Sequence, residues 1–263
     1  MGAAYSAGAT AWADGPTRVY QRLAELLVDF SPVPLAGRLV LDLGSGTGVG
    51  SRAALAAGAR VVATDLVPAM LRVDQAIRPP ASVGDIRQLP FRADGFDVVL
   101  APFALNHLDD PADGVREAGR VADLLVASTY AADDDHPAKG AVEAALHEVG
   151  WEKPQWYASL KVAMAAWGTV AAASAAIHAG GLAPVRVERF EVAMTDLGPA
   201  DMVRWRLGLA QSATFIERLD PATRAAVFTR ALDLLGPDPE PLVRRVIFLA
   251  ARSRPRAMKV VAP

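Results

Sequence analysis

Short apolar runs alternate with segments of helical pattern through the first half of the chain. The apolar runs are rich in Val, Leu and Ile, and they have the length and composition of buried strands. They occupy residues 38–44, 60–66, 81–86, 96–103 and 123–130. Helical patterns follow at 50–59, 68–77 and 110–122, and Pro68 stands at a helix start, a position that proline favours. Repeated alternation of strand and helix predicts a parallel sheet covered by helices on both faces.

The second half continues with longer helical segments. Helices are expected within residues 131–167, 169–181, 201–219 and 220–236, and strands at 184–194 and 242–253. No repeat or low-complexity linker divides the chain, and residues 254–263 are expected to be a loose tail.

Composition narrows the classes of protein that fit this pattern. The chain has 263 residues, of which 52% are hydrophobic and 21% charged, so a large core is expected. The net charge of −2 argues against a nucleic-acid-binding face, which needs a basic excess. The absence of cysteine excludes disulfides, thiolate metal sites and cysteine nucleophiles. No secretory signal is visible, and the uncharged stretch at 162–185 is mostly alanine, which predicts a buried helix rather than a membrane span.

Three glycines, Gly44, Gly46 and Gly48, follow the first strand at every second position. A strand that ends in a glycine-rich turn before a helix is where open α/β sheets bind nucleotides. The spacing departs from the dinucleotide fingerprint G-x-G-x-x-G, which disfavours a nicotinamide-dependent oxidoreductase. Asp42 precedes the loop and Asp65 ends the second strand, and carboxylates there repel a pyrophosphate and attract an amino group. The pattern favours a nucleoside ligand with a positive charge and no phosphate.

The stretch VLDLGSGTG (40–48) is similar to the first motif of class I S-adenosylmethionine-dependent methyltransferases. VVATDLVPAML (61–71), GDIRQLPF (84–91) and FDVVLAPFALNHLDDP (96–111) resemble the next three motifs in the same order. The resemblance is nearest to the small-molecule branch, which methylates quinones and natural products. It implies an α/β fold, a Rossmann-like doubly wound sheet of seven strands, mostly parallel with an antiparallel last strand. One departure is Ala122-Asp123, which replaces a glycine-rich turn before the fifth strand, so a tighter turn is expected.

The resemblance also implies which residues surround the cofactor, S-adenosyl-L-methionine, and its product S-adenosyl-L-homocysteine. They are Asp42, Gly44, Gly46, Gly48, Asp65, Leu66, Met70, Asp85, Ile86, Ala101 and Pro102. Asp65 is expected to accept hydrogen bonds from both ribose hydroxyls, or else to cap the helix at Pro68. Asp42 is expected to hold the amino group of the ligand, directly or through water, or else to be a charge stabilised by a helix N-terminus. Asp85 is expected to accept from the adenine amino group, or else to form a turn.

The acceptor side carries fewer signals. His107, just after the fourth strand, is a candidate general base, with helix capping as the alternative. Residues 133–136 are Asp-Asp-Asp-His, side chains that can bind Mg²⁺ or Mn²⁺, but Asp135 before Pro137 is also a good helix N-cap, and no metal is expected. Aromatic side chains outside the sheet indicate a lid over an apolar substrate. The substrate-lining candidates are Tyr5, Trp12, Phe103, Trp156, Tyr157, Trp167 and Trp205.

The expected organisation is an N-terminal helical lid segment at 1–37 and a methyltransferase domain at 38–253, with helical lid insertions at about 131–167 and 198–236. The expected function is methyl transfer to a small, largely apolar molecule in the cytoplasm, without nucleic-acid or membrane partners. Two alternatives keep the same cofactor: its use as a scaffold or charge for cyclisation or decarboxylation, and a non-catalytic regulator that binds it. The acceptor atom, the acceptor itself and the oligomeric state are open at this point.

Overall fold

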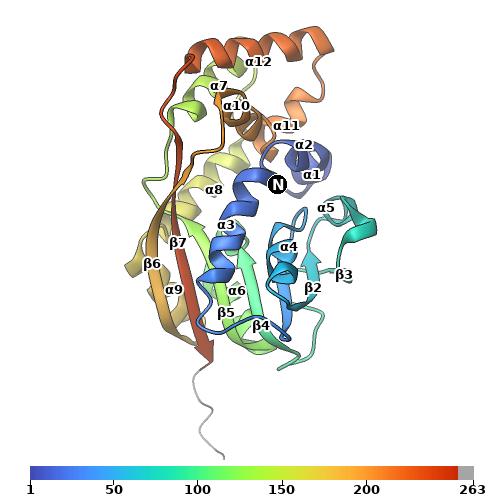
Figure 1. Ribbon diagram of the computed structural model, residues 1–263, viewed down its shortest axis with the longest axis vertical. Coiled ribbons are helices and arrows are strands. Elements are labelled where there is room, and N and C mark those ends of the chain that lie inside the picture. Colours follow the sequence, from blue (N-terminus) through green and yellow to red (C-terminus); the bar gives the residue numbers. More distant parts are fainter. Residues whose placement is uncertain (254–263) are drawn as a thin grey trace, which may run out of the picture.

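The computed structural model describes residues 1–253, so the tail expected at 254–263 lies outside the described residues. Seven strands form one sheet in the order β3-β2-β1-β4-β5-β7-β6 (Figure 1). The strands are β1 (Leu39–Leu43), β2 (Arg60–Asp65), β3 (Ala81–Val83), β4 (Phe96–Pro102), β5 (Ala122–Tyr130), β6 (Leu182–Met194) and β7 (Leu242–Ser253).

Strand β7 sets the mixed character of the sheet. It runs antiparallel to both of its neighbours, β5 and β6, whereas the other neighbouring strands are parallel. The predicted seven-stranded sheet with an antiparallel last strand is therefore confirmed. The carboxyl ends of β1, β2, β4 and β5 meet at one edge, which is the edge where open α/β sheets bind ligands.

Twelve α-helices and two short 3₁₀ helices are present within the described part of the chain. The α-helices are α1 (Gly2–Ala7), α2 (Ala9–Asp14), α3 (Thr17–Asp29), α4 (Val49–Ala56), α5 (Pro68–Arg72), α6 (Pro111–Val121), α7 (Pro137–His147), α8 (Gln155–Ala166), α9 (Val170–Ala179), α10 (Pro199–Leu207), α11 (Ala210–Ile216) and α12 (Pro221–Leu235). The 3₁₀ helices are η1 (Gln75–Ile77) and η2 (Leu105–His107).

Each face of the sheet has its own helical cover, because side chains alternate along each strand. On one face, Val98 and Leu100 of β4 pack against apolar residues of α3 and α4. On the other face, Val99 and Ala101 of the same strand pack against α6 and α9. Helix α6 passes into β5 at Val121-Ala122 without an intervening turn, which is the tight connection that the sequence predicted there.

A helical cap, formed by α1, α2, α7, α10, α11 and α12, lies beyond the carboxyl edge of the parallel strands (Figure 1). Helices α7, α10 and α12 surround a third apolar cluster, which includes Leu146, Val203 and Val227. Helix α1 packs against α11, so the N-terminal segment belongs to the same cap as the C-terminal helices. The cap covers the edge at which the glycine loop ends.

The helical segments expected at 1–37 and within 131–167 contain several helices: α1, α2 and α3 in the first, and α7 and α8 in the second. The single helix expected at 201–219 is interrupted and forms α10 and α11. At Gly208 a Cβ atom would lie 2.5 Å from the carbonyl oxygen of Ala11, so this break lets α2 approach α10. Between α7 and α8, Gly150 has a φ of +87° and Pro154 precedes the next helix, and both residues disfavour a continuous helix. The third strand is also shorter than expected and ends at Val83.

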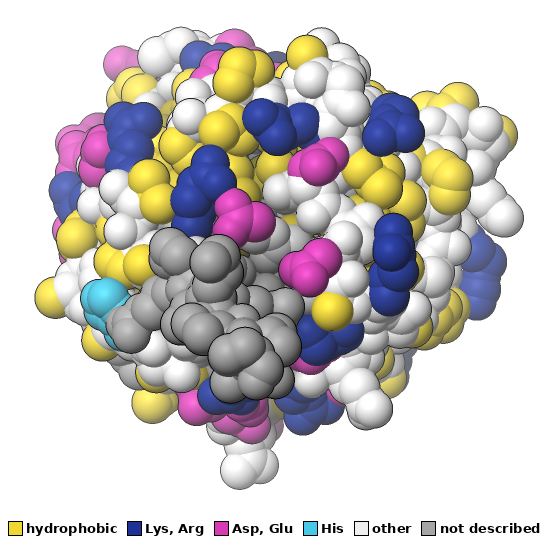
Figure 2. Space-filling view, turned by 90° about the horizontal axis from the view of Figure 1, so that it is seen from below, with side chains coloured by type: hydrophobic (Ala, Val, Ile, Leu, Met, Phe, Trp, Pro, Cys, Tyr) yellow, Lys and Arg dark blue, Asp and Glu magenta, His cyan; other side chains and the backbone are white. Residues whose placement is uncertain are grey.

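Two properties of the outer surface bear on partners. In the described residues no single helix has the length and apolar character needed to cross a membrane, while the bent pair of α8 and α9 meets those criteria only when the two are taken together. On the face seen from below in Figure 1, basic and acidic side chains are interspersed (Figure 2). The cytoplasmic location expected from the sequence stays a prediction.

Candidate functional site

A cavity of about 570 Å³ lies between the carboxyl edge of the sheet and the helical cap. Strand ends contribute Gly44, Asp65, Pro102 and Tyr130 to its wall. The cap and α8 contribute aromatic side chains, among them Tyr157. A volume of this size is typical of sites that enclose small molecules.

The glycine loop after β1 forms one end of the cavity. Gly44 and Gly46 have φ values of +64° and +52°, which side chains other than glycine rarely adopt. A Cβ atom on Gly44 would lie 2.6 Å from the Cβ atom of Ala104. Arg78 braces the loop, since its Nη2 donates to the Gly46 carbonyl at 2.8 Å and to Ser45 Oγ at 3.2 Å. The loop is thus fixed in a shape that brings bare backbone to the cavity.

Asp65 lies beside this loop at the end of β2. Its Oδ2 accepts from the Gly46 N–H and its Oδ1 from the Val67 N–H, both at 2.8 Å. Burial raises the pKa of the carboxyl group, and these two hydrogen bonds partly offset that effect. Val67 occupies the N-cap position of α5, so Asp65 supports the start of the helix from two residues before it. The carboxylate thus connects the glycine loop to the start of α5, and it lines the cavity.

Asp42 lies in the core beside the glycine loop and does not line the cavity. Its Oδ2 accepts from Ser51 Oγ at 2.6 Å, and its Oδ1 is buried without a partner. Burial raises the pKa of this carboxyl group to about 6. The sequence predicted that Asp42 holds the ligand's amino group either directly or through a water molecule. A buried position behind the cavity wall is compatible with contact through water.

The other predicted cofactor residues divide between cavity and core. Leu66, Met70, Asp85, Ile86 and Pro102 line the cavity with Gly44, Gly46 and Asp65. Gly48 and Ala101 do not, because Gly48 lies at the start of α4 and Ala101 is wholly buried inside β4. The carboxylate of Asp85 accepts from Arg87 at 2.7 Å, and this bond lowers the pKa of Asp85.

Phe103 turns the chain at the end of β4. It has a φ of +53°, a conformation that is unusual for a bulky residue and is typically retained at functional sites. Its ring stacks on Tyr130 at 4.5 Å between centroids and meets Tyr20 edge-on at 5.4 Å. The turn therefore places an aromatic surface in the wall of the cavity.

His107, at the end of η2, lines the cavity near Tyr5, whose ring lies edge-on at 5.6 Å between centroids. Its Nδ1 is buried without a partner, and burial lowers the pKa of the imidazole to about 4. The capping alternative is wrong, because the side chain of Asp110 caps α6 by accepting from the Ala112 N–H at 2.9 Å. His107 is thus a neutral imidazole that faces the cavity.

The predicted aromatic wall is only partly assembled. Tyr5, Trp12, Phe103, Tyr157 and Trp205 line the cavity. Trp167 does not line it, because it packs in the apolar core between the sheet and α9, with residues such as Ile177. Trp156 also lies outside the lining and contacts Tyr157 edge-on at 5.9 Å.

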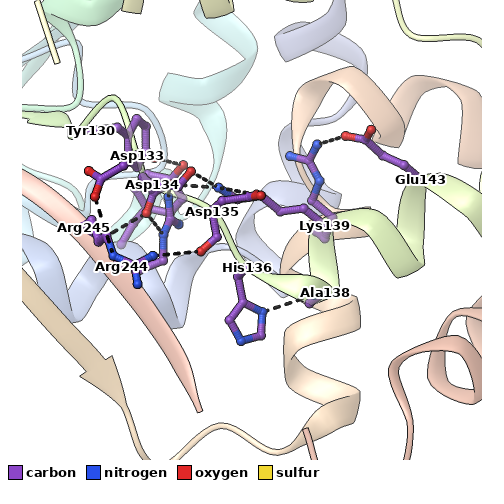
Figure 3. Close-up of polar contacts among 12 residues, drawn as sticks. Tyr130, Asp133, Asp134, Asp135, His136, Ala138, Lys139, Glu143, Arg244 and Arg245 are labelled. Carbon is purple, nitrogen blue, oxygen red and sulfur yellow. Dashed lines mark hydrogen bonds and ion pairs between the residues drawn. The ribbon is translucent and has the colours of Figure 1, made fainter. Parts of the chain in front are cut away.

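Sequence reasoning missed a cationic group at the end of the cavity near β5 and β7. Arg244 donates to both carboxylate oxygens of Asp134, at 3.0 and 2.8 Å, and Lys139 donates to the same carboxylate at 2.9 Å (Figure 3). The guanidinium of Arg244 also lies 4.7 Å from the ring centroid of Tyr130 and 4.8 Å from that of Trp205. A second cation, Arg206, is 3% exposed and lines the same cavity.

The acidic run at 133–136 is explained by these cations. Asp134 is fully engaged by Arg244, Lys139 and the Arg245 N–H, and within residues 1–253 no group of His, Asp and Glu is placed to hold a metal ion. The N-cap of α7 is His136 rather than Asp135, because the Nδ1 of His136 accepts from the Ala138 N–H at 3.2 Å (Figure 3).

The chain is similar to known methyltransferases in sequence and in fold. The family described as "Methyltransferase domain" matches residues 41–123. A demethylmenaquinone methyltransferase of Streptomyces griseus is 35% identical over 109 residues, which cover 41% of this chain and 46% of the relative. The chain thus matches less than half the length of this curated relative.

Solved structures extend the likeness to the whole fold. The methyltransferase chain solved with the Trm112 activator of Haloferax volcanii has a TM-score of 0.55 at 18% identity, over 97% of this chain and 96% of that one. The [4+2]-cyclase SpnF has a TM-score of 0.51 at 17% identity, over 89% and 80%. Residues 41–123 therefore match a methyltransferase domain, and the described chain has the fold of these solved methyltransferase-like structures.

Replacing Asp134 by Asn should lower the free energy of unfolding by about 3–5 kcal/mol, because it leaves Arg244 buried without its counter-charge. Burial alone would raise the pKa of Asp134, but Arg244 and Lys139 hold it well below its usual value. This stabilisation is therefore present above about pH 4 and is lost as the pH falls further. Urea unfolding at pH 7 measures the difference. The matched control is Asp133→Asn, whose side chain is 64% exposed and should change stability by less than about 0.5 kcal/mol.

Proposed function

We propose that this protein transfers a methyl group from S-adenosylmethionine to a small molecule with an aromatic or otherwise apolar body. The observation that carries the proposal is one cavity with two different ends. The glycine loop and Asp65 form one end, and Phe103, Tyr130 and Trp205 form the other. A ligand bound at the loop and an acceptor bound at the aromatic end would meet beside the end of β4.

The residues at the loop fit the cofactor. Bare backbone at Gly44 and Gly46 gives room for its amino-acid part, and we assign the Asp65 carboxylate, which lines the cavity beside this loop, the role of accepting from the ribose hydroxyls. Leu66, Met70 and Ile86 supply apolar surface for the adenine. When bound, S-adenosylmethionine supplies an electrophilic methyl group on a positively charged sulfur. The buried carboxylates of Asp42 and Asp65, with pKa values raised by burial, favour a cationic ligand in this place.

The chain itself contributes mainly alignment and exclusion of water. Phe103 and Tyr130 form a rigid stacked surface next to the end of β4, and the helical cap covers it. Holding two reactants in line at an enclosed site accounts for a large share of such a rate enhancement. We assign the helices of the cap, together with α8, the role of the lid that closes the site.

His107 is the candidate for proton transfer. Because its pKa is lowered to about 4, it is neutral at physiological pH and can accept a hydrogen bond from a hydroxyl or amine of the acceptor. The same low pKa makes it a weak base, so its contribution should lie near the lower end of the range for general bases.

Cofactor binding tests the proposal directly. Calorimetry should show binding of S-adenosylmethionine and S-adenosylhomocysteine, and Asp65→Ala should raise both Kd values about 10- to 150-fold, as expected for lost hydrogen bonds to a charged group. Asp123→Ala is the matched control, since that side chain is 59% exposed and lies at the opposite end of β5. Binding of NAD in place of these compounds would overturn the proposal. Release of S-adenosylhomocysteine on turnover separates methyl transfer from cyclisation or decarboxylation.

His107→Gln should lower turnover about 100-fold while the Kd of the cofactor changes only a few-fold. A neutral base is active above its pKa, so the native profile should be level between about pH 6 and 8 and should fall only as the pH approaches 4. The measurement is S-adenosylhomocysteine release with an acceptor found by screening small aromatic molecules. The exposed His178→Gln serves as the control. Unchanged turnover in His107→Gln would limit that residue to packing.

A further inference from the structure

We infer that the acceptor carries a single carboxylate, which Arg244 and Lys139 hold at the end of the cavity remote from the glycine loop. The inference rests on the proposed function and specifies its substrate class. It modifies the expectation of a largely apolar acceptor, because a charged group is added to the apolar body.

The first observation is an unused donor. Arg244 is 3% exposed and lines the cavity, and two of its nitrogens, Nε and Nη2, are engaged by Asp134. Its third nitrogen, Nη1, is buried without a partner. Buried N–H groups of a guanidinium are almost always paired, so we take this unpaired nitrogen of a cavity-lining residue as the donor for a ligand oxygen.

The second observation is a local excess of one positive charge. Arg244 and Lys139 face the single carboxylate of Asp134, and side chains of Arg244 and Lys139 are only 3% and 13% exposed. The nearest further carboxylate, Asp135, lies 3.8 Å from Lys139 but is 84% exposed, so water screens it. A monoanion balances this excess, whereas a phosphate dianion would overcompensate it. The planar guanidinium also suits a carboxylate.

The third observation is the path between the two ends. Strand order places β4 and β5 between β1, which carries the glycine loop, and β7, which carries Arg244. Phe103 at the end of β4 and Tyr130 at the end of β5 stack on each other along that path. An aromatic or apolar body therefore spans these rings, with its carboxylate on Arg244 and its reacting atom toward β4. The carboxylate is an anchor and not the group that is methylated.

The same cavity holds further donors that support an acceptor with oxygen atoms. Arg206 Nε, Trp205 Nε1 and Gln211 Nε2 are buried without partners, and all three residues line the cavity. Arg206 itself is fixed by Glu143 and by Tyr157, whose hydroxyl accepts at 3.3 Å. Glu143 is shared between the buried Arg206 and Lys153, whose ammonium lies 2.9 Å from it but is 43% exposed and screened by water. This second arginine therefore adds mainly hydrogen bonds.

The test uses three probes that share one naphthalene ring system: 2-naphthoate, its isosteric amide 2-naphthamide, and the bulkier 2-naphthyl phosphate. Calorimetry gives their Kd values on the protein saturated with S-adenosylhomocysteine. The acid should bind about tenfold or more tightly than the amide, and Arg244→Gln should reduce that ratio to about one. Arg245→Gln is the matched control, because it removes the same charge from the next residue of β7, which is paired with Glu191 outside the cavity. It should keep the full ratio.

Lys139→Gln covers the case in which Arg244→Gln does not fold, and it should lower the acid-to-amide ratio at least about threefold. Absence of a preference for the acid, including absence of detectable binding, overturns the inference, as does a ratio unchanged in Lys139→Gln. Tighter binding of the phosphate than of the acid also overturns it. The Kd of the cofactor is measured first. Failure to bind S-adenosylhomocysteine counts against the proposed function. Normal cofactor binding without a preference for the carboxylate counts only against this inference.

Discussion

The ion pair between Asp134 and Arg244 is the interaction on which the acceptor half of the cavity depends. It links the loop after β5 to β7, and it draws in Lys139 from the first turn of α7. It also fixes the guanidinium against the rings of Tyr130 and Trp205, which belong to the sheet and the cap. A buried pair of this kind contributes little net stability when intact, but it is costly to break. Its effect is to hold separate elements in one arrangement.

The two ends of the cavity have opposite electrostatic character. Near the glycine loop, burial raises the pKa values of Asp42 and Asp65, and hydrogen bonds to these carboxylates and the positive charge of Arg78 partly offset this effect. At the other end burial and the neighbouring charge of Arg244 together lower the pKa of Lys139 to about 8, against the opposing effect of Asp134. Both ends of the cavity therefore contain charged side chains whose charged forms are destabilised by burial. A cationic cofactor at the first end and an anionic acceptor at the second would stabilise these buried charges. This arrangement favours binding of the cofactor and the acceptor together.

Local sequence signals predicted the parts of the fold and site that depend on backbone conformation. The glycine loop, Pro68 at the first position of α5 and the last strand from Leu242 to Ser253 all follow from residues that are adjacent in the chain. The helix break at Gly208 could not be predicted in this way. It depends on the close approach of Ala11 in α2, which lies about two hundred residues away in the chain. Trp167 was assigned to the cavity by residue type alone, and its packing in the core depends on tertiary position.

One sequence feature could have indicated the cationic end of the cavity: an arginine at a buried position of the last strand. At the start of β7 buried positions alternate with more exposed ones, and Arg244 falls between Leu242 and Val246 in the buried phase, whereas Arg245 falls in the other phase. A charge at an apolar position of a central strand requires a buried partner, and such a charge is a candidate site residue. The partner, Asp134, was recognised only as part of an acidic run. Pairing the two required the register of β5 and β7.

The groups that surround the acceptor restrict how the reaction can be promoted. Burial lowers the pKa of His107 to about 4 and raises those of Tyr5, Tyr20 and Tyr130, so none of these side chains is a strong base at neutral pH. Lys139, with a pKa of about 8, is mostly charged there. The described residues therefore favour an acceptor that is already nucleophilic or that loses its proton readily. For such an acceptor, the rigid Phe103–Tyr130 stack and the Arg244 anchor contribute most by fixing its direction toward the methyl group.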